Sequence, residues 1–200
     1  MSDTALVRLL ALLDLESLGE NAFGGTSPAQ PATRIFGGQV LSQALVAAAR
    51  TVDSRRLCHS LHAYFLRPGD PKTPILYEVD RSRDGTSFTA RRVVAIQHGE
   101  PIFTMSASFQ TVEQGLEHQL PMPEVPDPDT LKPEHQWRME IASDLPEHAR
   151  SWFLRPRPIE IRPVDPANRF AKGKHPPFQT VWFRAVGPLP ETASLHQCVV

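Results

Sequence analysis

The sequence predicts an α+β fold in which a long helix is wrapped by a strongly curved antiparallel sheet. Two observations carry this prediction. Apolar residues cover more than one stripe of the segment 38–52, which is typical of a helix surrounded by other elements. Four strand-like runs then follow without an intervening helix, which favours antiparallel pairing. A helix of that length spans about 22 Å, which a curved sheet can enclose.

The chain before this central helix begins with a second, shorter one. Leu6, Leu9, Leu10 and Leu13 recur at three- and four-residue spacing, so residues 3–15 are predicted to form an amphipathic helix. Residues 16–36 are rich in glycine and proline and are predicted to be irregular, although Ala22 and Phe23 are compatible with a short strand.

The strand-like runs are separated by turn signals. Asp84–Gly85 is typical of a type I′ hairpin, and His98–Gly99–Glu100 indicates a second tight reversal. We therefore expect the runs to form a four-stranded meander. They cover residues 57–66, 75–83, 86–97 and 102–111.

Both faces of the predicted sheet carry apolar side chains. In the third run, Phe88 and Val94 fall on one face, whereas Val93 and Ala95 fall on the other. An antiparallel sheet with one face in water shows a cleaner alternation of polar and apolar residues. One face is therefore expected to pack on the helix and the other on a second sheet or subunit.

Proline usage changes along the chain. Of 20 prolines, six lie in residues 1–120 and fourteen in residues 121–200. This shift predicts a domain boundary near residue 113. Beyond it we expect a weak helix, two strands and the start of another helix, at 136–152, 157–164, 179–186 and from Leu189. The expected domains are 1–112, a proline-rich linker at 113–155, and 156–200.

Composition excludes several classes of function. The net charge is −1, with 21 basic against 22 acidic residues, so nothing points to nucleic acid or a membrane surface as a partner. No apolar run approaches the roughly 20 residues of a bilayer helix. Cys58 and Cys198 fit neither a disulfide framework nor a zinc motif, so a reduced, cytoplasmic protein without a metal site is expected.

The start of the central helix is the first candidate site. Gly37 and Gly38 precede Gln39 at the point where helix N–H groups lack partners. Glycine lets a ligand approach the backbone, and the helix dipole favours negative charge on a carbonyl or phosphate oxygen. The alternative is that these glycines only permit a tight turn and close packing.

His59 is the second candidate. Strict alternation places it on the face of Leu61 and opposite His62, so the two histidines are not expected to bind one metal. His59 is either a hydrogen-bonded, half-buried histidine or a pocket residue near the helix start. Alternation also separates its side chain from that of Cys58, which argues against a Cys–His nucleophile pair.

The predicted sheet is locally basic. Its arginines are interpreted as surface or interface pairing partners rather than as a phosphate clamp. They are Arg67, Arg81, Arg83, Arg91 and Arg92.

Four motifs together closely resemble the acyl-CoA thioesterase II family, in the order and spacing of that family. They lie at 36–39, 59–70, 83–92 and 105–110, and shorter matches at 162–164, 181–184 and 195–197 continue the resemblance, which runs from residue 5 to residue 200.

The resemblance implies a double hotdog fold, in which each repeat is a long helix wrapped by a curved antiparallel sheet. We expect one complete hotdog and the start of a second. It also implies hydrolysis of fatty acyl-CoA to a free fatty acid and coenzyme A, with acyl-CoA as substrate and no cofactor. Gly37, Gly38, Gln39 and His59 are predicted to bind substrate. An uncovered sheet face predicts a homo-oligomer.

The resemblance assigns no catalytic residue in this sequence. In the family, water is activated by Asp, Thr or Ser, and Gln of the second hotdog, and the Asp follows a His–Gln pair by about two helical turns. Here the sequence ends three residues after Gln197. A non-catalytic acyl-CoA binder or assembly subunit is therefore an alternative. A hotdog hydratase is disfavoured, because Gly69–Asp70–Pro71 lacks the Asn and His of its signature.

Overall fold

The structure is a computed structural model that describes residues 4–28, 33–166 and 173–189. The chain divides into two compact units, one containing Arg8–Gly115 and the other containing Leu116–Pro188. No helix among the described residues combines the length and the apolar character needed to cross a membrane.

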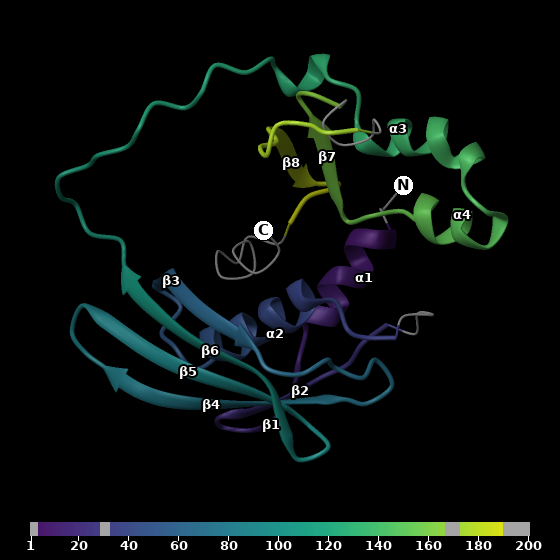
Figure 1. Cartoon of the computed structure of the whole chain (residues 1–200). Helices are drawn as coiled ribbons and strands as arrows, with labels where there is room; N and C mark the ends of the chain where they lie inside the picture. The colour runs from purple at the N-terminus through teal and green to yellow at the C-terminus, as the bar shows by residue number, and fades with distance from the viewer. Residues whose placement is uncertain (1–3, 29–32, 167–172, 190–200) are drawn as a thin grey trace. The chain divides into compact units, whose positions relative to one another are not determined.

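The first part of the chain contains two helices and a six-stranded antiparallel sheet, in which the strand order is β1-β2-β4-β5-β6-β3. Figure 1 shows the long strands curving around α2. This arrangement confirms the predicted α+β hotdog architecture. The elements are α1 (Thr4–Leu13), β1 (Glu16–Gly19), β2 (Ala22–Gly25), α2 (Gly37–Ala49), β3 (Arg56–Phe65), β4 (Ile75–Asp84), β5 (Phe88–Gln97) and β6 (Glu100–Thr111).

The core lies between α2 and the inner face of the sheet. Ala44, Ala47 and Ala48 of α2 are completely buried. Such small side chains allow strands to approach the helix closely. The odd-numbered residues of β5, and those of β6 from Phe103 to Phe109, are buried and form the inner face. The even-numbered residues of the two strands form a more exposed outer face, apart from Ile102 at the start of β6, which is buried.

The meander prediction is correct for β4, β5 and β6 and wrong for β3. β3 pairs with β6, for example Leu61 with Ala107, and not with β4. The connection 66–74 therefore links two strands that are not neighbours in the sheet. Turn residues such as Pro68 and Gly69 indicated a change of direction, but they do not specify the next partner.

Two details of the hairpins differ from the prediction. Gly85 has no positive φ, so Asp84–Gly85 is not a type I′ turn. That geometry lies instead at His98 and Gly99, with φ values of 52° and 77°. Residues 16–36 are also more regular than expected, because β1 pairs with β2, and Ala22–Gly25 forms the short strand considered above.

The second unit contains short helices and a two-stranded antiparallel sheet. The single helix predicted at 136–152 is wrong: the chain becomes extended at Leu145, and Pro146 is the N-cap of a new helix that begins at Glu147. The missing N–H of Pro146 is harmless there, because no helical hydrogen bond needs it. Both predicted strands are confirmed, whereas the helix predicted from Leu189 lies largely outside the described residues. The elements are η1 (Pro128–Thr130), α3 (Glu134–Ile141), η2 (Ala142–Asp144), α4 (Glu147–Leu154), β7 (Ile159–Pro163) and β8 (Val181–Ala185).

Part of the proline-rich segment is held against this small sheet. The Arg162 guanidinium donates to the carbonyl of Pro128 at 2.6 Å, and the Trp182 indole N–H donates to the carbonyl of Pro126 at 3.1 Å. Proline carbonyls are good acceptors even though proline has no N–H. The three domain ranges given above stay predictions.

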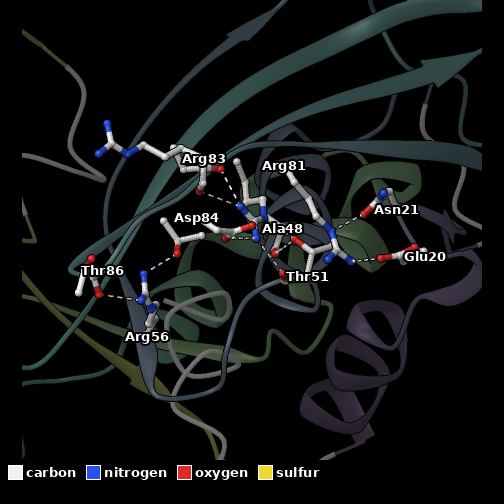
Figure 2. A network of polar contacts seen from close by, with 12 residues as sticks. Glu20, Asn21, Ala48, Thr51, Arg56, Arg81, Arg83, Asp84 and Thr86 are labelled. Carbon is white, nitrogen blue, oxygen red and sulfur yellow. Dashed lines mark hydrogen bonds and ion pairs between the residues drawn. The ribbon is translucent and has the colours of Figure 1, made fainter.

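One arginine of the sheet is buried rather than at the surface. Arg91 is 2% exposed, and its guanidinium forms an ion pair with Asp84 at 2.7 Å. It also donates to the carbonyl of Thr51, just beyond α2, at 2.9 Å, and to that of Arg83 at 3.1 Å. Figure 2 shows these three partners close together. The hydrogen bond from Arg91 holds the pKa of the Asp84 carboxyl below its usual value.

This burial predicts different effects for two adjacent arginines. Replacing Arg91 by Ala removes a buried guanidinium together with its ion pair and its hydrogen bonds to part-buried carbonyls, and it opens space in the core, so we expect R91A to lower the free energy of unfolding by about 3 kcal/mol. Arg92 lies on the exposed outer face, and R92A is expected to change the free energy of unfolding by less than about 0.5 kcal/mol. Urea unfolding of both variants measures the difference. Equal losses would contradict the structural role of Arg91.

Candidate functional site

The N-terminus of α2 has no side-chain cap. Phe36 occupies the N-cap position in an extended conformation and contributes no side-chain hydrogen bond, and Gly37 and Gly38 follow as the first helical residues. The first N–H groups of a helix point out of its end and have no partner within the helix. Backbone donors and the positive end of the helix dipole thus coincide here.

The two glycines also have a packing role. A Cβ atom on Gly37 would lie 3.0 Å from the ring of Phe65 on β3, and one on Gly38 would lie 2.5 Å from the ring of Phe36. Close packing, the alternative considered for these glycines, therefore holds at Gly37. The same lack of a side chain keeps the backbone at the helix start accessible.

A pocket of about 370 Å³ adjoins this helix start. Its walls are mainly apolar, and two arginines with exposed side chains, Arg34 and Arg67, also line it. The Arg67 guanidinium contacts Glu100 at 2.9 Å and donates to the carbonyl of Pro101 at 2.8 Å. The apolar lining residues are Ile35, Val40, Phe65, Leu66, Ile102 and Phe103.

Gln39 points away from this pocket. Its side-chain amide donates to the carbonyl of Thr26 at 3.1 Å and to the hydroxyl of Ser27 at 3.0 Å. The residue therefore ties the segment after β2 to the first turn of α2. Gly37, Gly38 and Gln39 lie together at the helix start, but among them only Gly37 lines the pocket.

His59 lies on the opposite face of the sheet from the one predicted. A β-bulge between Cys58 and Ser60 interrupts the alternation. The His59 ring is hydrogen-bonded to the hydroxyl of Ser108 at 2.8 Å and meets the ring of Phe88 edge-on, and both partners belong to the outer face. His62 pairs with Ser106 and shares that face, so the predicted separation of the two histidines is also wrong.

The structure does not bring His59 to the helix start. Gly37 contacts Phe65, which lies six residues further along β3 and hence about 20 Å from His59. The four residues predicted to bind substrate thus fall into two separate places. Their roles stay predictions.

A buried polar pair fixes α2 beside this site, and sequence analysis did not identify it. Gln43 is completely buried, and its carbonyl oxygen accepts a hydrogen bond from the Tyr77 hydroxyl at 2.8 Å. Its amide donates to the carbonyls of Leu12 at 2.7 Å and Thr26 at 3.2 Å. Burial raises the pKa of Tyr77, so its hydroxyl stays protonated as a donor. The sequence feature that could have indicated this pair is a glutamine among the apolar residues of the central helix.

The described residues contain no group of three or more His, Cys, Asp or Glu side chains arranged to hold a metal ion. Cys58 lies on the inner side of the bulge, opposite Phe109, and its thiol donates to the carbonyl of Ser60 at 3.4 Å. Burial raises the pKa of this thiol, which lowers the fraction of reactive thiolate.

Comparison with known proteins points to one family. Residues 19–110 match the model of the acyl-CoA thioesterase N-terminal domain. The chain is 41% identical to human acyl-coenzyme A thioesterase 8 over 212 residues, which cover 98% of the chain and 64% of that protein. It is 40% identical to acyl-CoA thioesterase 2 of Haemophilus influenzae, with 100% of the chain and 70% of that protein covered.

A solved structure shows the same similarity. The acyl-CoA thioesterase II TesB2 from Mycobacterium marinum is 41% identical, with a TM-score of 0.72 over 96% of this chain and 65% of that one. The chain therefore spans about two thirds of the length of these three proteins.

The Gln43–Tyr77 contact predicts different effects of the same change at two tyrosines. Y77F leaves the buried carbonyl oxygen of Gln43 without this donor, and we expect a loss of about 1.5 kcal/mol in the free energy of unfolding. Tyr64 is 61% exposed, so Y64F is expected to change it by less than about 0.5 kcal/mol. Thermal and urea unfolding provide the test, and a Y77F protein as stable as Y64F would rule out the proposed contribution.

Proposed function

Because this chain belongs to the acyl-CoA thioesterase II family, we propose that it acts in the hydrolysis of fatty acyl-CoA to a free fatty acid and coenzyme A. The observation that carries the proposal for this chain is the uncapped start of α2 beside a mainly apolar pocket. The walls of the pocket suit an acyl chain, because burying apolar surface stabilises the bound state.

The same place suits the thioester and the phosphates of the substrate. Attack of water on a thioester carbonyl develops negative charge on its oxygen, and backbone N–H groups at a helix start stabilise such charge. Gly37 and Gly38 are proposed to present these groups. Arg34 and Arg67 line the same pocket with exposed side chains, and guanidinium groups bind phosphate well.

The other predicted site residues take different roles in this proposal. Gln39 supports the site by holding residues 26–27 to the helix start. His59 lies on the outer face and has no part in this pocket, so a contact with substrate would have to occur at a different surface. Water activation is assigned to Asp, Thr or Ser, and Gln of a second hotdog, whose first strands we place from residue 156 onward.

The proposal extends to assembly and compartment. The outer face of the sheet exposes Phe88 and Tyr64, which supports a homo-oligomer or a second sheet as its cover. The thiol of Cys58, with its raised pKa, is compatible with a reducing cytoplasm.

Acyl-CoA binding and thiol release, measured on the same sample, test the function. We expect calorimetric titration with acetyl- to palmitoyl-CoA to show tighter binding than free coenzyme A, because only the acyl chain buries apolar surface. Release of coenzyme A, followed with a thiol reagent, is expected from protein that carries the second-hotdog residues to which water activation is assigned. Binding without release would favour the alternative of a non-catalytic acyl-CoA binder, and absence of binding would overturn both.

Two glycine variants locate the site within the chain. A methyl group at Gly37 enters the space between the helix start and Phe65, so G37A is expected to weaken acyl-CoA binding about tenfold, or roughly 1.4 kcal/mol. Gly115 has no atom within 4 Å of an added Cβ, so G115A serves as the matched control and is expected to bind like the original protein. Equal affinities of the two variants would place the acyl-CoA site elsewhere.

A further inference from the structure

Gln97, the last residue of β5, is 4% exposed and its side chain binds a loop instead of another strand. Its carbonyl oxygen accepts a hydrogen bond from the N–H of Asp70 at 2.8 Å. Its amide donates to the carbonyl of Asp70 at 2.9 Å and to that of Thr73 at 2.6 Å. The side chain thus pairs with the backbone of Asp70 in the manner of a neighbouring strand.

This loop forms one wall of the pocket at the start of α2. Arg67, Pro68 and Gly69 all line that pocket. The beginning of the loop is tied to the sheet, because the N–H groups of Leu66 and Arg67 donate to the carbonyl of Ile102 at 2.8 and 3.2 Å. The part beyond Gly69 has no secondary structure of its own.

The remaining polar contacts of the loop are local or exposed. The Asp70 carboxylate accepts from the N–H of Lys72 at 2.9 Å and from the hydroxyl of Thr73 at 2.8 Å, both within the loop. His98 lies 3.6 Å from Asp70, but its side chain is 67% exposed, and exposed pairs contribute little. Gln97 is therefore the buried polar anchor for residues 70–73.

A short chain of contacts links Gln97 to the helix start. The carbonyl of Gly69 accepts a hydrogen bond from the N–H of Ile35 at 3.0 Å, and Ile35 lies two residues before Gly37. The packing at this point leaves no free space, because a Cβ atom on Gly69 would lie 2.9 Å from Ile35 and 3.4 Å from the side-chain oxygen of Gln97. Movement of residues 69–70 would therefore shift the segment that leads into α2.

We propose that Gln97 is a positioning residue for acyl-CoA: it holds residues 69–73 of the loop against Ile35 and so sets the wall of the pocket beside Gly37. This inference rests on the proposed function. An amide is suited to the task because it offers a donor and an acceptor at once without burying a charge. A leucine of similar size offers neither and leaves the backbone of Asp70 unpaired.

Two Gln→Leu variants test the proposal. Gln110 lies on the outer face of β6, opposite Phe88, and is the matched control. We expect Q97L to weaken binding of the best acyl-CoA of the titration series about tenfold and binding of free coenzyme A less than twofold. Q110L is expected to change the affinity for acyl-CoA and the affinity for free coenzyme A by less than twofold each. Titrations are performed well below the melting temperature of each variant, so that all samples are folded.

Hydrogen exchange and a second variant separate positioning from simple stabilisation. In Q97L, the amide of Ile35 is expected to exchange faster than in Q110L. G69A perturbs the same contact from the loop side, and we expect a similar loss of acyl-CoA affinity even if Q97L does not fold. If the original protein binds no acyl-CoA, the proposed function fails. If it binds but Q97L matches Q110L, or loses acyl-CoA and coenzyme A equally, the role of Gln97 is refuted.

Discussion

The close packing of α2 against the inner face of the sheet is the contact on which the rest of the larger unit depends. Ala44, Ala47 and Ala48 are completely buried there, and their small size lets the curved strands approach the helix axis. The hydrophobic effect drives this contact, but it has no preferred direction and leaves the helix free to slide or rotate. Directional contacts are needed to fix where the helix begins.

Buried polar side chains provide these directional contacts at three places along α2. Gln43 and Tyr77 fix the middle of α2 relative to β4, and Arg91 binds the backbone just beyond its C-terminal end. Gln97 ties the loop that faces the N-terminal end. Gln43, Arg91 and Gln97 each bind backbone carbonyls from distant parts of the chain, so each contact is specific for one arrangement of the chain.

Much of this architecture could be predicted from local sequence patterns, because periodicity and turn residues act over a few residues. The central helix, the strands and the reversal at His98–Gly99 follow from such patterns. The bulge at His59 could not be predicted, because it needs no particular residue type and yet moves every side chain on one side of it to the other face. For that reason strict alternation predicts the wrong face for His59.

The sequence by itself determined which residues form the helix, which form the strands, and which family the chain resembles, since its motifs are read residue by residue. Only the tertiary structure decided that β3 lies beside β6, that Gly37 and His59 occupy separate places, and that Gln97 reaches a loop more than twenty residues away in sequence. Strand order and buried hydrogen bonds depend on contacts between residues that are far apart in the sequence. Local propensity depends only on neighbouring residues, so it does not predict such contacts.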